Sequence, residues 1–118
     1  MADRTITYLN DACLITCVVE KDMAEPILEA AKKEGAQGAT ISYAIGTGIR
    51  ERMGLLGVTI DEQKEVIRMI VSKDQSQHIF DTMYIAGQLD MPGKGIMFMT
   101  ALDKVATFIP DSINQKNN

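Results

Sequence analysis

The stretch ACLITCVVE, from Ala12 to Glu20, decides the fold of this 118-residue chain. Its apolar side chains alternate onto both faces of an extended backbone. Cys13, Ile15, Cys17 and Val19 lie on one face, and Leu14, Thr16 and Val18 lie on the other. A strand that is apolar on both faces is typical of the middle of a sheet. The stretch therefore predicts a central strand.

The segment after this strand has the pattern of an amphipathic helix. Apolar residues recur at helical spacing from Asp22 to about Glu34. Asp22 and Glu25 have the spacing of a capping box, in which two side chains accept hydrogen bonds from free backbone N–H groups at the start of a helix. Gly35 is well placed to end the helix in a left-handed turn.

The rest of the chain adds four strands and a second helix. Strands are predicted at Gly38–Ile45, Glu65–Val71, Gly95–Ala101 and Val105–Ile109, and a helix is predicted from Ser72 or Asp74 to Gly87. The order strand, helix, strand, strand, helix, strand predicts an α+β, ferredoxin-like βαββαβ fold with an antiparallel sheet and both helices on one face. A long loop separates the second and third of these strands.

The helices of such a fold cover one face of the sheet only. The strands at 12–20 and 65–71 are apolar on nearly both faces. Leaving each Val, Ile, Leu or Met side chain of the second face in water forfeits about 1.5–3 kcal/mol. We therefore expect the second face to be buried in a homo-oligomer.

Composition indicates a single soluble domain spanning 1–118. The chain is 46% hydrophobic and 24% charged, with a net charge of −4, which argues against a nucleic-acid partner. Its apolar runs are shorter than the roughly 20 residues that span a bilayer, so we expect no direct membrane insertion and a cytoplasmic location. Residues 1–11 are predicted to form an N-terminal arm, and residues 111–118 a polar tail.

The stretch GTGIRERMGLLGVTIDEQ, residues 46–63, has neither a helical nor an alternating period. Connections of this length inside a compact domain are usually binding elements or disordered segments. A charged base at Arg50–Arg52 leads to an apolar tip broken by glycines. We expect the loop to signal by docking into a partner protein through Arg52, Leu55, Leu56 and Val58. Alternatively, the tip folds back onto its own oligomer.

Side chains suited to catalysis or metal binding are sparse. Cys13 and Cys17 lie about 13 Å apart along one strand, which is too far for a disulfide, so buried structural thiols are expected. His78 is the single histidine and is expected on the solvated surface. No His/Cys zinc set, carboxylate pair or nucleophile–base arrangement can be assembled, so no catalytic residue and no metal site are predicted.

Three strings, in order, resemble the P-II nitrogen-regulatory family. They are GAQGATISYAIGTG (35–48), EVIRMIVSKDQ (65–75) and PGKGIMFMTALDKV (92–105). Members of that family are trimeric signal proteins that bind adenine nucleotides in clefts between subunits. The resemblance implies a homotrimer with an adenine nucleotide or another small anion as effector. It also implies a target protein, either a transporter or a metabolic enzyme.

The resemblance assigns a ligand site residue by residue. Gly46 and Gly48 fall on the loop-base positions, and Gly93 and Gly95 fall on a second glycine pair. In the family both pairs approach the nucleotide phosphates, where backbone N–H groups exposed by glycine can bind an anion. Contacts with the adenine ring are implied for Val18, Thr40 and Val71.

Departures from the family pattern affect the expected effector. A lysine just after the second glycine pair is replaced by Ile96, and two arginines near the C-terminus are replaced by Thr107 and Ile109. Lys94 could supply one positive charge instead. ADP or AMP is therefore at least as plausible as ATP, and no cofactor is required.

Two further departures concern the loop. Arg50 replaces a glutamine that helps the family to bind Mg-2-oxoglutarate, so this sensing is expected to be lost or altered, although Arg50 remains a candidate ligand residue. The loop also contains no tyrosine, which excludes uridylylation there. Two alternatives to a sensor are a metal-tolerance-type structural trimer of the same architecture and an enzyme that slowly hydrolyses nucleotides.

Overall fold

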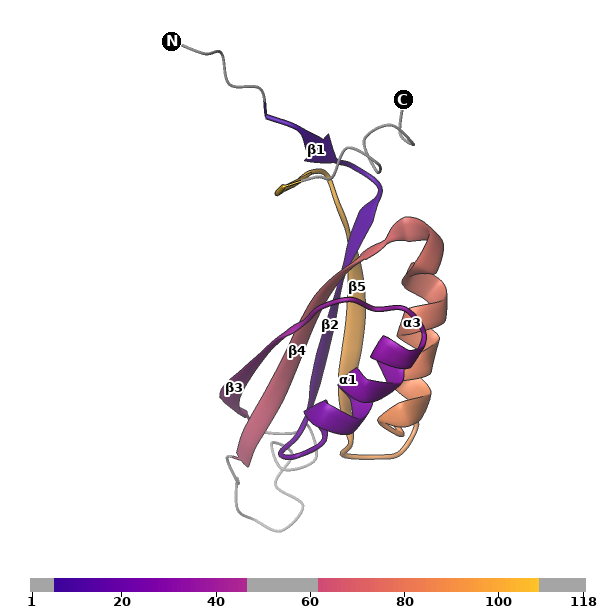
Figure 1. Cartoon of the computed structure of the whole chain (residues 1–118). Coiled ribbons are helices and arrows are strands. Elements are labelled where there is room, and N and C mark those ends of the chain that lie inside the picture. The colour runs from indigo at the N-terminus through magenta and orange to yellow at the C-terminus, as the bar shows by residue number, and fades with distance from the viewer. Residues whose placement is uncertain (1–5, 47–61, 109–118) are drawn as a thin grey trace.

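A computed structural model describes residues 6–46 and 62–108 and shows two layers, a sheet and a pair of helices (Figure 1). The elements are β1 (Tyr8–Leu9), β2 (Ala12–Glu20), α1 (Ala24–Lys33), β3 (Thr40–Gly46), β4 (Glu62–Ser72), α3 (Lys73–Ala86), β5 (Gly95–Leu102) and β6 (Val105–Ala106). The predicted α+β, ferredoxin-like fold is confirmed, with both of these helices on the same face of the sheet.

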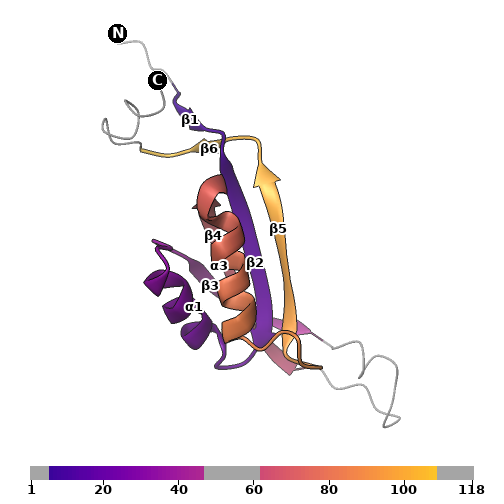
Figure 2. The same ribbon diagram turned by 90° about the vertical axis from the view of Figure 1, so that its right-hand side faces the viewer.

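The main sheet has four antiparallel strands in the order β3-β4-β2-β5. β2 pairs with β4 on one side and β5 on the other, which confirms that it is a central strand. Figure 2 shows α1 and α3 lying side by side against this sheet. The sheet is therefore covered by helices on one face.

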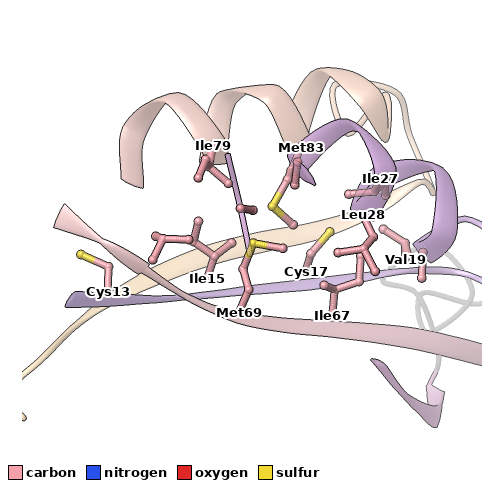
Figure 3. Packing of buried hydrophobic residues seen from close by; sticks show 14 residues of the cluster. Cys13, Ile15, Cys17, Val19, Ile27, Leu28, Ile67, Met69, Ile79 and Met83 are labelled. Atoms are coloured by element: carbon pink, nitrogen blue, oxygen red, sulfur yellow. The ribbon is translucent and has the colours of Figure 1, made fainter. Parts of the chain in front are cut away.

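The core lies between this face and the helices (Figure 3). Cys13, Ile15, Cys17 and Val19 of β2 all point into it, as the alternation predicts. β4 adds Ile67, Met69 and Val71, and the helices add Ile27, Leu28, Ile79 and Met83. Each fully buried side chain of this kind stabilises the fold by about 1.5–3 kcal/mol.

The opposite face of the sheet carries apolar side chains that no layer of the described chain covers. Ile70, Ile96 and Phe98 are 53%, 61% and 49% exposed. Ile96 lies across from Val18, and Ile70 lies across from Leu14. This open face has the apolar character that the sequence predicts, and its burial in an oligomer stays a prediction.

Helix α1 begins differently from the prediction. Its N-cap is Met23, with no side-chain capping bond, and Asp22 takes a φ of 70°, so the predicted capping box is wrong. Oε1 of Glu65, on β4, instead accepts a 2.9 Å hydrogen bond from the backbone N–H of Ala24. A distant carboxylate thus serves the helix start, where free N–H groups favour negative charge.

The two helices end in the same kind of turn but with different residues in the left-handed position. Gly35, with a φ of 104°, ends α1 as predicted, and the N–H of Ala36 bonds to the carbonyl of Ala31. After α3 the left-handed residue is Gln88, with a φ of 54°, and Gly87 has an ordinary φ of −86°. A Cβ at Gly87 would lie 2.9 Å from Cδ1 of Ile27, which is the far end of a side chain that can shift.

The N-terminal arm contains a strand that the sequence did not indicate. β1 pairs antiparallel with β6, joining Tyr8 to Ala106 and Leu9 to Val105. This register continues that of β2 with β5, in which Ala12 lies opposite Leu102. The two pairings form one long ribbon that extends past the helices (Figures 1 and 2). A two-residue strand is too short to show a period, and pairing with β6 fixes it.

Several predicted boundaries also move. The strands on either side of the long loop reach Gly46 and Glu62, so they include both ends of the predicted 46–63 loop, because the ladder between them continues to the pair Gly46 and Glu62. β6 is shorter than the predicted strand 105–109. Residues 1–5, 47–61 and 109–118, which include the rest of the loop and the polar tail, lie outside the described residues.

Candidate functional site

One end of the sheet gathers the ends of four strands. Gly46 at the end of β3 pairs with Glu62 at the start of β4, and Glu20 at the end of β2 pairs with Lys64. Gly95 at the start of β5 lies opposite Val19. The register therefore brings Gly46, where the long loop begins, and the second glycine pair to the same end of the molecule.

The two glycine segments nevertheless lie on opposite lateral edges of the sheet. β3 and β5 are the outer strands, with β4 and β2 between them. Three strand spacings of about 4.8 Å separate the segments by roughly 14 Å. A site that takes both segments from one copy of the chain would have to span this width of the sheet.

The turn at Gly93-Lys94-Gly95 has a backbone that glycine makes possible. Gly93 and Gly95 have φ values of 79° and 152°, which side chains rarely allow. A Cβ on Gly95 would lie 2.3 Å from the carbonyl oxygen of Val18, so β5 starts in tight contact with β2. Open space surrounds the corresponding position of Gly93. The turn is therefore anchored at Gly95 and accessible at Gly93.

Lys94 already has a partner in this turn. Its Nζ lies 3.5 Å from Oε1 of Glu20, and the two side chains are 36% and 41% exposed. The sequence pointed to Lys94 as a source of positive charge but did not indicate Glu20. Strand pairing places the carboxylate there, and pairing cannot be read from sequence spacing alone.

The three residues implied to contact adenine do not share a surface. Val18 and Thr40 both lie on the open face, since Val18 pairs with Val66 and Thr40 pairs with Arg68. Val71 lies on the helix-covered face and is 6% exposed. Packing accounts for the burial of Val71, and its contact with a ligand stays a prediction.

Six of the predicted site residues lie outside the described residues. They are two residues of the ligand set, Gly48 and Arg50, and the four predicted partner contacts, Arg52, Leu55, Leu56 and Val58. Ile96, at the position of the family's lysine, is exposed at the edge of the open face. Thr107, at the position of one arginine, is also exposed.

An open, mostly apolar pocket of about 240 Å³ lies beside the glycine turn. It is formed by the C-terminal half of α3 and the start of β5. Its lining residues are Phe80, Tyr84, Leu89, Gly95, Ile96 and Met97. The turn thus has a cation on one residue and an apolar hollow next to it.

Side chains capable of acid–base or metal chemistry remain scattered over the described part of the chain. No group of three His, Cys, Asp or Glu side chains that could hold a metal ion occurs within residues 6–46 and 62–108. His78 is exposed, as expected, and its Nε2 lies 2.7 Å from Oε2 of Glu34, which links α3 to α1. Both side chains are exposed to water, so this contact contributes little to stability.

Cys17 is expected to be chemically inert in the folded protein. It is 0% exposed, and burial raises the pKa of its thiol from 9.0 to about 11. Titration with a thiol reagent at pH 8 should leave Cys17 unmodified, and added denaturant should expose it.

The pKa of Cys17 also makes the stability depend on pH. Because this pKa is higher in the folded protein than in the unfolded chain, the free energy of unfolding should fall as the pH rises from about 9 to about 11. A Cys17→Ala variant should lack the part of this fall that Cys17 causes.

Glu65 is a second residue that the sequence did not single out. The sequence pattern nevertheless indicated a buried carboxylate, because Glu65 falls on the same face of its strand as Ile67 and Met69. A carboxylate on an apolar face needs a hydrogen-bond donor, and such a position suggests a buried partner. The identity of that partner, the start of α1, follows only from the fold.

The architecture and the glycine-bounded sheet end define the class of the protein. They describe a ferredoxin-like α+β domain with a long connection leaving the end where both glycine segments lie. The family model described as nitrogen regulatory protein P-II matches residues 12–111. The chain therefore belongs to the P-II family, whose members are regulatory proteins. β1 precedes the matched region.

Solved structures agree with this fold. One similar structure is Arabidopsis thaliana PII bound to citrate, with a TM-score of 0.62 and 19% sequence identity over 80% of this chain and 79% of that chain. Among curated proteins, no significant match to the sequence is found. No helix within the described residues is long and apolar enough to cross a membrane.

Proposed function

We propose that this P-II family member is a homotrimeric regulator that binds a small anionic effector between subunits and controls a target protein through the 46–63 loop. The favoured effector is an adenine nucleotide, and the favoured target is a transporter or a metabolic enzyme in the cytoplasm. The observation that carries the proposal is the sheet end at which Gly46 and the Gly93–Gly95 turn lie on opposite edges.

The cation in the glycine turn bears on which effector this site would prefer. Lys94 stands in the turn, and the apolar Ile96 occupies the position of the family's lysine. Fewer positive charges favour a ligand with fewer negative charges, because each phosphate needs its own charge-assisted donors. ADP or AMP therefore suits the site better than ATP. Citrate, which the Arabidopsis protein binds, supports testing other small anions too.

The open face supports the homotrimer. Ile70, Ile96 and Phe98 lie on it with about half or more of their surface exposed. Apolar side chains that lie together and exposed on one sheet face often mark an interface. A closed ring in which the β3 edge of one subunit meets the β5 edge of the next would bring one glycine segment of each kind together at each contact.

A regulatory role is favoured over both alternatives. An enzyme that hydrolyses nucleotides with a protein-held metal would need clustered ligands, and none occur among the described residues. A metal-tolerance-type trimer would need clustered ligands, and Cys13 and Cys17 lie in the core with no third ligand beside them in the described chain. No observation on the described residues specifically favours either alternative.

Calorimetric titration with AMP, ADP, ATP and citrate, together with light scattering, tests the proposal. We expect a trimer that binds at least one of these anions. Lys94→Gln should weaken that binding about tenfold without changing the trimer, because it removes one charge-assisted contact. Glu29→Gln, on the exposed side of α1, is a matched surface control and should bind as the wild type does.

Two results would overturn the proposal. A monomer at micromolar concentration would refute the interface on the open face. A trimer that binds none of the four anions would leave the fold intact and remove the proposed effector class.

A further inference from the structure

We propose that Glu20 is a built-in competitor of the effector for Lys94 and limits how much negative charge the site accepts. This inference rests on the proposed function, since it concerns the same glycine turn. It assigns a specificity-determining role to a residue of β2 that lies outside the P-II motif positions identified in the sequence.

The position of Glu20 sets it between two lysines. Glu20 is the last residue of β2, and its partner across the ladder on β4 is Lys64. On its other side, Lys94 approaches from the turn before β5, with Nζ 3.5 Å from Oε1 of Glu20. The formal charge of Lys94 and Glu20 together is zero, and it becomes +1 when Glu20 is made neutral.

The ion pair between Glu20 and Lys94 is weak enough for Lys94 to change its partner. Both side chains are more than a third exposed, and ion pairs in contact with water are weak. An arriving anion can therefore replace the Glu20 carboxylate as the partner of Lys94. Glu20 then remains beside the site as an unfavourable like charge, and its repulsion grows with the charge of the ligand.

The backbone cannot relieve this competition. Gly95 is held against the carbonyl oxygen of Val18, where even a Cβ would not fit. The main chain of Glu20 is also fixed, because its carbonyl accepts a 3.2 Å hydrogen bond from the N–H of Met23. Because the backbone is held at both Gly95 and Glu20, the partner of Lys94 changes only through movement of side chains.

A graded effect of nucleotide charge distinguishes this role from a structural one. We expect Glu20→Gln to raise affinity for ATP by about five- to tenfold, for ADP by less, and for AMP by about twofold or less. The titrations are made without divalent cations, so that each nucleotide keeps its full charge. Glu20→Ala should give the same order of gains in affinity, largest for ATP and smallest for AMP. Thermal unfolding should show that both variants fold.

A double-mutant cycle shows whether Glu20 acts through Lys94. In a Lys94→Gln background, Glu20→Gln should lose most of its effect on ATP affinity. Glu29→Gln removes an exposed carboxylate elsewhere and should leave all three affinities unchanged. High salt should shrink the difference between wild type and Glu20→Gln, because it screens the like charge.

The outcomes separate this inference from the proposed function. If Lys94→Gln weakens binding while both Glu20 variants bind ATP no better than the wild type, the competitor role is wrong and the proposed site stands. An equal gain for AMP and ATP would also refute it. If neither the wild type nor the Glu20 variants bind any of the three nucleotides, both the inference and the nucleotide effector are wrong.

Discussion

Replacing Gly95 by alanine is expected to destabilise the folded protein by about 3 kcal/mol or more. An alanine Cβ would lie 2.3 Å from the carbonyl oxygen of Val18, and two atoms of Val19 lie within 3.2 Å. The clash is with backbone, which cannot rotate away, and the φ of 152° adds strain for any side chain. Urea denaturation of the wild type and the variant measures the loss.

Two other glycines serve as controls for this prediction. Gly93→Ala meets nothing within 4 Å but keeps a φ of 79°, so about 1–2 kcal/mol of backbone strain is expected without a clash. Gly38→Ala meets neither obstacle and should change stability by about 0.5 kcal/mol or less. A Gly95→Ala variant as stable as Gly38→Ala would show that β5 does not start against β2 in this way.

Replacing Glu65 by alanine is expected to cost about 2–3 kcal/mol. Glu65 is 7% exposed, and its carboxylate accepts the hydrogen bond from the Ala24 N–H. The alanine variant leaves that N–H without an acceptor at the buried start of α1 and removes the packed methylene groups. Chemical denaturation measures the stability, and amide hydrogen exchange near Ala24 should accelerate.

Glu65→Gln is the matched variant, because its side-chain oxygen can accept the same hydrogen bond. It should lose about 1 kcal/mol or less, which corresponds to the charge at the helix start. Equal losses for the alanine and glutamine variants would mean that the hydrogen bond is not the source of the stability. In that case, the interaction of the charge with the helix start would account for the whole effect.

Local patterns predicted the fold well because the core depends on local alternation. Cys13 to Val19 enter the core in the order that their period predicts, and Gly35 ends α1 where its φ requires glycine. The predictions that failed depended on neighbours far away in the chain. Asp22 has the right spacing for a cap, yet Glu65 supplies it from a strand that no local rule relates to α1.

Glycine function was the least predictable property. Gly87 has the sequence position of a helix-ending residue in the left-handed conformation, but Gln88 takes that conformation instead. The candidate site has the same limit. The glycine turn and Lys94 can be found by their sequence, whereas Glu20 beside Lys94 requires the pairing of three strands.

The central position of β2 has a consequence for how the chain folds. Residues 12–20 are made before both of the segments that they pair with, residues 64–72 and 95–102. Folding slows as contacting residues lie farther apart in sequence, since the chain must close large loops before those contacts form. The neighbouring pair β3 and β4 can form first. On the ribosome, the apolar strand that decides the fold must therefore wait until residues 95–102 have been made before its last neighbour is available.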